Sequence, residues 1–146
     1  METRKKQSSV INLNFAEPPK PLPIKIENTD CLGERSIKRR WITKNTADRQ
    51  KIIDATFKQC ESNAKKEYDD YMHACEITGS PCTPQELAQY EQTLLIVLWQ
   101  CGIDKGKAET YNADIWALNW ERVDREYASC CVANPGKGHG CDAADQ

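Results

Sequence analysis

The spacing of apolar residues changes at Thr46. From that position apolar side chains recur at steps of three and four residues, which is the period of one face of an α-helix. The first such stretch ends at Gly79 and predicts a helix over about 47–78. Its apolar face contains Ile53, Phe57, Cys60, Ala64, Tyr68, Tyr71 or Met72, and Cys75.

A second helix is predicted over about 83–101. Thr83-Pro84-Gln85-Glu86 is a capping box: the threonine is the N-cap, proline takes the first helical position, and glutamate follows three residues after the cap. The apolar face continues to Cys101, and Gly102 is interpreted as the end of the helix. Residues 94–99 are all apolar, which indicates burial on more than one side and is typical of the central helix of a bundle.

A third helix is predicted over about 106–132, after a break at Gly102 and Gly106. Asn134-Pro135-Gly136 ends it, and its apolar face contains Ile115, Trp116, Trp120, Val123, Tyr127, and Cys130 or Cys131. The large indole rings of Trp99, Trp116 and Trp120 are interpreted as core residues. The pattern as a whole predicts an all-α fold, a three-helix antiparallel bundle in one domain over 46–133.

The residues outside this bundle are predicted to lack helices. Residues 1–45 show no helical periodicity and are predicted to form an extended arm, with polyproline geometry at Pro18-Pro19-Lys20-Pro21-Leu22-Pro23 and a short extended stretch at 24–27. The prolines fit a linker better than a ligand for a proline-binding domain. Residues 134–146 are polar and contain glycines, which predicts a flexible tail.

Eight cysteines in 146 residues make the redox state a central question for this chain. A short connection makes the first two helices antiparallel, so residues that face each other lie at similar distances from the turn. By this register, pairing Cys60 with Cys101 and Cys75 with Cys82 leaves a stagger of about 3 Å. Crossed pairings would separate the sulfurs by more than about 20 Å, which no disulfide spans. The sequence therefore predicts two nested disulfides, and the alternative is that these cysteines are reduced and pack in the core.

Two cysteines on each of two antiparallel helices resemble the coiled-coil-helix–coiled-coil-helix proteins of the mitochondrial intermembrane space. The resemblance covers residues 60–101. Those proteins use one shorter spacing on both helices, whereas here 14 residues separate Cys60 from Cys75 and 18 separate Cys82 from Cys101. The resemblance therefore implies a similar construction, and neither function nor location is carried over from it.

Four further cysteines, Cys31, Cys130, Cys131 and Cys141, have a pairing that the sequence leaves open. One bridge of this set can attach the N-terminal arm to the end of the third helix. Alternatively, His139 and the last three of these cysteines offer an imidazole and three thiolates, the ligand types of a structural zinc site. Their spacing matches no standard zinc ribbon or finger, so disulfides or free thiols are preferred, and neither a metal nor a cofactor is predicted.

The charge of the chain is unevenly distributed. The net charge is −2 and the pI is near 5.7, which indicates no nucleic-acid or anionic-membrane partner for the chain as a whole. Residues 34–51 are the exception, with seven basic and two acidic side chains. Six residues of this segment are predicted to bind a partner: Arg35, Lys38, Arg39, Arg40, Trp41 and Lys44. An acidic protein surface is the preferred partner, and a nucleic-acid backbone with a base stacked on the tryptophan is the alternative.

No set of residues indicates catalysis. The sequence has no local Ser-His-Asp motif and no glycine-rich phosphate loop after a strand, and only two histidines are available as general bases. The longest apolar run has six residues, against the roughly 20 of a membrane helix, so no membrane span is predicted. No apolar segment of a signal peptide follows the basic N-terminus.

We therefore expect a non-enzymatic protein-interaction module, such as an accessory subunit, a binding protein or an inhibitor. Its location is expected to be an oxidising compartment, namely the periplasm, the extracellular space or an intermembrane space. The alternative is a cytoplasmic helical adaptor or regulator with reduced cysteines, which contacts nucleic acid through residues 35–44.

Overall fold

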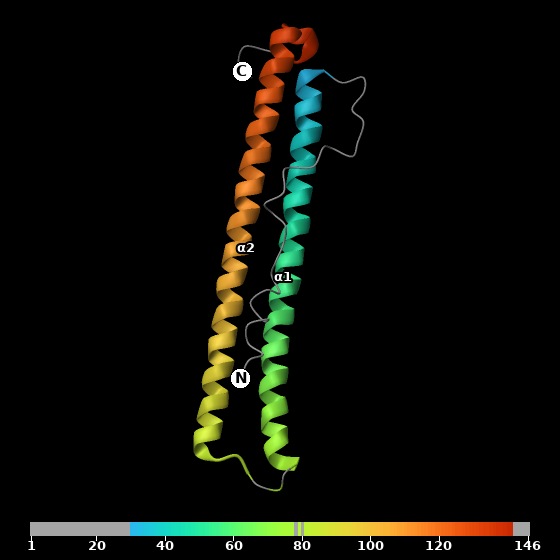
Figure 1. Cartoon of the computed structure of the whole chain (residues 1–146). Helices are drawn as coiled ribbons and strands as arrows, with labels where there is room; N and C mark the ends of the chain where they lie inside the picture. The colour runs from blue at the N-terminus through green and yellow to red at the C-terminus, as the bar shows by residue number, and fades with distance from the viewer. Residues whose placement is uncertain (1–29, 78, 80, 142–146) are drawn as a thin grey trace. The chain divides into compact units, whose positions relative to one another are not determined.

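The computed structural model describes residues 30–77, 79 and 81–141, and this part of the chain is built from helices. Helix α1 (Cys31–Ile77) and helix α2 (Pro84–Ala133) form a helical hairpin, and a single 3-10 turn, η3 (Lys137–His139), follows α2 (Figure 1). The all-α prediction is confirmed. The predicted bundle of three helices is wrong, because the described residues contain only two long helices.

The two predicted helices at 83–101 and 106–132 are one continuous helix. α2 runs through Gly102 and Gly106, and neither adopts the left-handed backbone that Gly79 has at the end of α1, with φ 75°. A glycine inside a helix costs only about 1 kcal/mol relative to alanine. Packing along the rest of a 50-residue helix outweighs that cost, so these glycines do not interrupt it.

The first helix begins earlier than predicted. α1 starts at Cys31, so residues 31–45 are helical and not part of an extended arm. The carboxylate of Asp30 accepts a hydrogen bond of 2.7 Å from the backbone N–H of Gly33, which is an N-cap contact. The predicted polyproline geometry at 18–23 and the extended stretch at 24–27 lie outside the described residues.

The connection between the helices follows the predicted capping box. The backbone N–H of Glu86 donates to the hydroxyl of Thr83, and the backbone N–H of Thr83 donates to the carboxylate of Glu86, each at 3.1 Å. This reciprocal pair satisfies two N–H groups that the first turn of α2 would otherwise leave open. The capping box is thereby confirmed.

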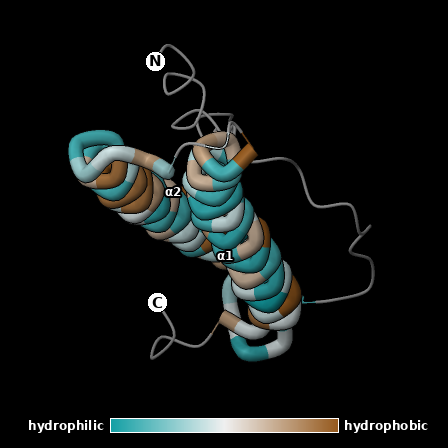
Figure 2. The backbone as a smooth tube through the Cα atoms, turned by 90° about the horizontal axis from the view of Figure 1, so that it is seen from below, coloured by the Kyte–Doolittle hydropathy of each residue, from teal (hydrophilic) through white to brown (hydrophobic). Residues whose placement is uncertain are grey.

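The chain consists of two compact units. The described part of the first, which we call the turn unit, lies within Lys51–Glu109, and the described part of the second, the terminal unit, is 30–50 with 110–141. In the turn unit, one buried cluster is made largely of small side chains, namely Cys60, Ala64, Val97 and Cys101, with Phe57, Leu94 and Leu98 packed against them; Ile53 and Ala108 are also buried in this unit. Hydrophobic residues recur among hydrophilic ones along both helices (Figure 2).

The terminal unit has a more polar interior. Ile42 and Val123 are buried, and so are Asn112 and Asn119. The amide of Asn112 accepts a hydrogen bond of 2.6 Å from Nε of Arg49 and donates one of 3.1 Å to the carbonyl of Thr46, so α1 and α2 are joined there by polar contacts. Burial lowers the pKa of Arg49 from its ordinary value.

The predicted flexible tail is ordered as far as Cys141. After α2 the chain turns through η3, and an isolated antiparallel bridge pairs Gly136 with Cys141. The hydroxyl of Tyr127 donates 2.9 Å to the carbonyl of Gly140, which attaches the turn to α2. Residues 134–141 are therefore a closed turn, and residues 142–146 lie outside the described part.

Candidate functional site

All eight cysteines are among the described residues, and all are joined in disulfides. In the turn unit the pairs are Cys60–Cys101 and Cys75–Cys82, the same two pairs that the register of the hairpin predicts. In the terminal unit the pairs, which the sequence left open, are Cys31–Cys130 and Cys131–Cys141. Four disulfides indicate an oxidising environment.

The two disulfides of the turn unit lie at different depths. Cys60 and Cys101 are fully buried in its core, whereas Cys75 and Cys82 flank the connection between the helices. Tyr71 and Tyr90 stack between these levels, with ring centroids 5.0 Å apart. The two helices of this unit are therefore covalently linked at two levels along their length, which makes the unit rigid.

No helix in the described part of the chain has an apolar stretch long enough to cross a membrane.

The basic segment predicted to bind a partner lies on α1 in the terminal unit, and several of its charges are neutralised there. Nζ of Lys38 lies 2.8 Å from a carboxylate oxygen of Glu126 and 3.0 Å from one of Glu34. The guanidinium of Arg39 lies 2.6 Å from the carboxylate of Asp124 and over the ring of Trp120, 4.7 Å from its centroid. Both cations therefore contact α2.

The other residues of this segment that were predicted to bind a partner differ in their neighbours. The guanidinium of Arg35 lies 4.1 Å from the ring centroid of Tyr127, and Nζ of Lys44 pairs with Asp48 one turn further along α1, at 2.7 Å. Arg40 is exposed, and Trp41 is half-buried. Most of the basic side chains thus have aromatic or acidic neighbours within the terminal unit, which weakens the case for a phosphate or acidic partner on this surface.

An open depression of about 550 Å³ in the terminal unit is lined by charged groups that also pair with one another. Its lining consists of Glu34, Lys38, Arg122, Arg125, Glu126, Ser129 and Cys130. Arg122 and Arg125 lie 3.3 and 3.1 Å from the carboxylates of Glu126 and Glu121. Three cations and two carboxylates line the depression, and each cation pairs with a carboxylate, so little free charge is left to bind an anion there.

The contacts of Lys38 affect its ionisation. Partial burial lowers the pKa of its ammonium group, but hydrogen bonds and charge attraction from Glu126 and Glu34 more than offset this, and the pKa is raised above 10.5. A raised pKa means that the protonated form stabilises the fold. That contribution is complete below the unfolded pKa of 10.5 and is lost as the pH rises through the higher folded value.

Replacing Lys38 with methionine is expected to lower the free energy of unfolding by about 1 kcal/mol at pH 7, because the change removes the cation and leaves both carboxylates without it. The difference from the wild type should shrink above pH 10.5, where the lysine itself loses its proton. Lys44→Met is the matched control, since the Lys44 side chain is 76 % exposed and that of Lys38 only 12 %. Urea unfolding followed by circular dichroism at pH 7 and pH 11 measures the free energy of unfolding of both variants. Equal losses in the two variants at pH 7 would contradict a stabilising role for the Lys38 ion pairs.

One exposed surface on α2 in the turn unit was not predicted from the sequence. Leu95, Ile96 and Trp99 are 66 %, 57 % and 67 % exposed, although Trp99 was predicted to be a core residue. Val97 and Cys101, which are buried, follow Leu95 and Trp99 by two positions, or about 200° around a helix. α2 is therefore apolar on two opposite sides in this unit, and α1 covers one of them.

Gly102 and Gly106 belong to the same exposed side, because the steps from Leu95 to Trp99 and on through the two glycines are four, three and four residues. Apart from the adjacent residues and the nearby backbone of α2 itself, no atom of the described part of the chain lies within 4 Å of a Cβ built on either glycine. We call Leu95, Ile96, Trp99, Gly102 and Gly106 the outer face of α2. No charged residue occurs from position 92 to position 103.

The all-apolar run at 94–99 was the sequence signal for this face. The predicted burial of this run on more than one side is wrong, because the third helix expected to cover the second side does not exist among the described residues and Leu95, Ile96 and Trp99 are exposed. Comparison with protein-family models, curated proteins and solved structures finds no match for this chain.

Proposed function

We propose that this chain is a non-enzymatic protein-interaction module whose binding surface is the outer face of α2. One observation supports this most directly: three large apolar side chains, Leu95, Ile96 and Trp99, are more than half exposed next to one another in an uncharged stretch. Single exposed apolar residues are common on soluble proteins, but a contiguous group that includes tryptophan is typical of an interface.

The disulfides support a binding role for the same unit. Cys60–Cys101 joins α1 to α2 directly behind the outer face, since Cys101 is the neighbour of Gly102 on the buried side. A surface held in its bound shape loses less conformational entropy on association. An interaction module in the periplasm, the extracellular space or an intermembrane space is consistent with this use of disulfides.

The partner that fits this face best is a second copy of the chain. The large and small residues are placed symmetrically about a point between Gln100 and Cys101. In an antiparallel pair of α2 helices related by a two-fold axis at that point, Trp99 of each copy faces Gly102 of the other, and Leu95 faces Gly106. Each large side chain then lies opposite a position without one, as an isologous interface requires.

The two glycines also support an antiparallel pair of α2 helices. Two exposed glycines inside a helix cost about 2 kcal/mol relative to alanine. A Cβ added at either glycine would meet open space on the outer side of α2. A glycine does allow another backbone or a large ring to approach the helix closely. The open space beside both glycines therefore leaves room for close contact in the pair.

Replacing Gly102 and Gly106 with alanine is expected to have opposite effects on folding and on association. The free energy of unfolding of the single chain should rise by about 2 kcal/mol, because alanine is the better helix former. The dissociation constant of the dimer should increase about tenfold or more, because the added methyl groups overpack the sites of Trp99 and Leu95. Ser62→Ala, at an exposed position of α1 in the same unit, is the control that improves helix propensity without touching the outer face.

Sedimentation equilibrium over a dilution series measures association, and urea unfolding at high dilution measures stability. Dimer formation that is unchanged in the double alanine variant would remove the glycines from the interface. A wild-type chain that stays monomeric at every concentration would overturn the second copy as partner and leave the outer face to another occupant, either residues 1–29 of the same chain or a different protein.

The basic segment of α1 is less suited to bind a partner than the outer face of α2. Lys38 and Arg39 pair with Glu126 and Asp124 of α2, so binding a nucleic acid there would break contacts at 2.8 and 2.6 Å before making new ones. The neutral outer face also predicts that association depends little on salt, whereas phosphate binding would weaken steeply as salt is added.

A further inference from the structure

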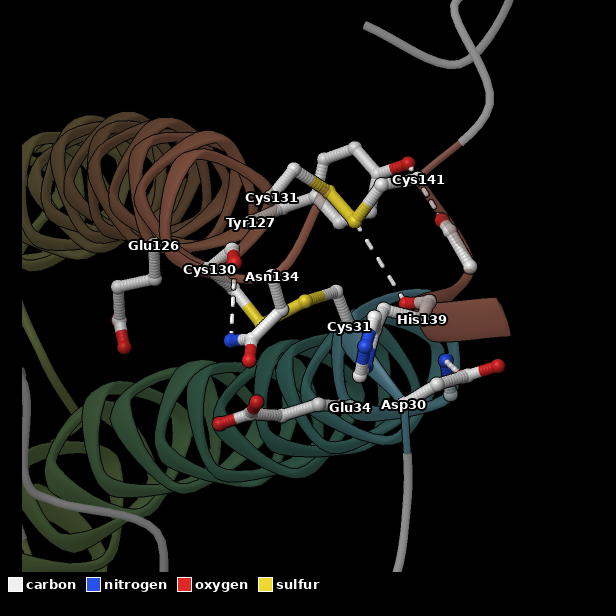
Figure 3. Close-up of a disulfide and its surroundings, with 12 residues drawn as sticks. Asp30, Cys31, Glu34, Glu126, Tyr127, Cys130, Cys131, Asn134, His139 and Cys141 are labelled. Carbon is white, nitrogen blue, oxygen red and sulfur yellow. Dashed lines mark hydrogen bonds between the residues drawn. A yellow bond between two sulfur atoms is a disulfide. The ribbon is translucent and has the colours of Figure 1, made fainter. Parts of the chain in front are cut away.

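Sulfur atoms from two different disulfides meet in the terminal unit. Sγ of Cys31, Sγ of Cys131 and Sγ of Cys141 all lie within 4.8 Å of one another, and all three residues are buried. Cys31 is bonded to Cys130, and Cys131 is bonded to Cys141, so the fourth sulfur is a covalent neighbour of this group. Figure 3 shows the two disulfides next to each other between the end of α2, the start of α1 and the C-terminal turn.

Three separate elements bring these sulfurs together. Cys31 is the first residue of α1, and Cys130 and Cys131 lie in the last turn of α2. Cys141 returns to them because the closed turn pairs its backbone N–H with the carbonyl of Gly136 at 3.1 Å. The cluster therefore depends on the fold of this unit and does not follow from any short motif.

The closed turn packs tightly against the start of α1, which fixes the position of Cys141. Gly140 has φ 72°, and a Cβ at this position would lie 2.7 Å from Cβ of Leu32 and 3.0 Å from its backbone nitrogen. Only glycine fits such a close approach in this left-handed conformation. The neighbouring Tyr127 hydroxyl, bonded to the carbonyl of Gly140, holds the same turn from the α2 side.

We propose that this cluster becomes a tetrahedral thiolate site for Zn²⁺ when its two disulfides are reduced. Cys31, Cys131 and Cys141 are the three central ligands, and Cys130, released from Cys31, supplies the fourth. A phosphine or dithiol reductant delivers four electrons and four protons in total, cleaving two S–S bonds and leaving four thiols. Zinc then forms four Zn–S bonds and displaces the four thiol protons to solvent.

The geometry requires little rearrangement. Zn–S bonds of about 2.3 Å place tetrahedral ligands about 3.8 Å from one another. After reduction, the two sulfurs of each former disulfide must separate by roughly 2 Å, and the central sulfurs that are not bonded to each other lie within 4.8 Å and must approach by up to about 1 Å. Thiolates are soft ligands that select zinc over hard cations such as Mg²⁺ and Ca²⁺. The terminal unit would then be closed by disulfides under oxidising conditions and by a metal under reducing ones.

The position of Cys31 explains why spacing alone indicated no zinc site. His139 and the three cysteines near the C-terminus match no standard ribbon or finger, and the missing ligand comes from a residue 99 positions before Cys130. The backbone carbonyl oxygen of His139 lies 3.5 Å from the sulfur of Cys141. Its imidazole is not assigned to the metal.

The test uses the full chain reduced with a phosphine and titrated with Co²⁺, followed by competition with Zn²⁺. We expect one Co²⁺ per chain with the visible absorption of tetrahedral thiolate coordination, displaced by zinc, and no uptake by the oxidised chain. Cys31→Ser and Cys141→Ser should each weaken binding at least about 100-fold. The double variant Cys75→Ala/Cys82→Ala, which removes two thiols of the turn unit, should bind as the wild type does.

A second measurement separates a folded site from unfolded cysteines that collect metal. Zinc should raise the melting temperature of the reduced chain, and the cobalt spectrum should be lost in urea at concentrations that unfold the helices. No cobalt uptake by the reduced wild type would overturn the proposal. Binding that survives Cys31→Ser, or that persists unchanged in urea, would overturn it equally.

Discussion

A chain with both Cys60 and Cys101 replaced by alanine is expected to lose about 4 kcal/mol of stability, roughly a thousandfold in its folding equilibrium. The disulfide closes a loop with a sequence separation of 41 residues, so it removes much conformational freedom from the unfolded chain. The core that surrounds it contains Ala64 and Val97 and few large side chains, so apolar burial cannot make up the loss. Alanine is chosen over serine because a hydroxyl at these buried positions would add a desolvation cost of its own.

The matched control is the second pair of the same unit. Cys75 and Cys82 are separated by only 7 residues, and replacing both with alanine should cost about 2.5 kcal/mol. Urea unfolding of the two variants and the wild type, followed by circular dichroism, gives the comparison. Equal losses would mean that loop length does not govern the contribution of these disulfides, and no loss in the Cys60/Cys101 variant would show that the pair is not a structural support.

Replacing Trp99 with aspartate is expected to abolish dimer formation in the concentration range where the wild type associates. Loss of a central interface tryptophan typically costs about 2 kcal/mol or more, which is about 30-fold in the dissociation constant. The two-fold axis presents the change twice, so the expected weakening is about a thousandfold. A carboxylate opposite Gly102 of the second copy would also be placed in a stretch that has no charged residue from position 92 to position 103, where burying a charge is costly.

Leu118→Asp is the control for this change. Leu118 is also on α2 and is 59 % exposed, close to the 67 % of Trp99, but it belongs to the terminal unit and not to the outer face. Sedimentation equilibrium should show wild-type association for this variant and a monomer for Trp99→Asp. If both aspartates weakened the dimer equally, the effect would come from added charge in general. An unchanged dimer in Trp99→Asp would place the contact elsewhere.

Features that depend on nearby residues could be predicted from the sequence. The capping box at Thr83 and Glu86 was one of them, because both hydrogen bonds join residues three positions apart. The pairing of cysteines across the short connection was another, since two helices joined by a few residues can only lie antiparallel and their register then follows from counting. The all-helical class followed from the same periodicity.

Features that depend on competition between local signals and distant packing could not be predicted. Gly102 and Gly106 looked like a helix end, yet the cost of each glycine is small beside the packing of the rest of α2. The start of α1 at Cys31 was not predicted because Arg35, Lys38 and Arg39 interrupt the apolar periodicity of this stretch. These basic side chains instead contact acidic and aromatic side chains of α2, and such distant contacts cannot be seen in the local sequence.

By itself the sequence determined that the chain folds into helices, where the turn lies, and that α2 has apolar residues on two sides. Only the tertiary structure decided that α1 covers one of those sides and leaves Leu95 and Trp99 exposed. It also decided that the sulfur of Cys31 meets those of Cys131 and Cys141. The physical reason is the same in both cases: periodicity defines the faces of a helix, but which face finds a neighbour depends on residues far away in the chain.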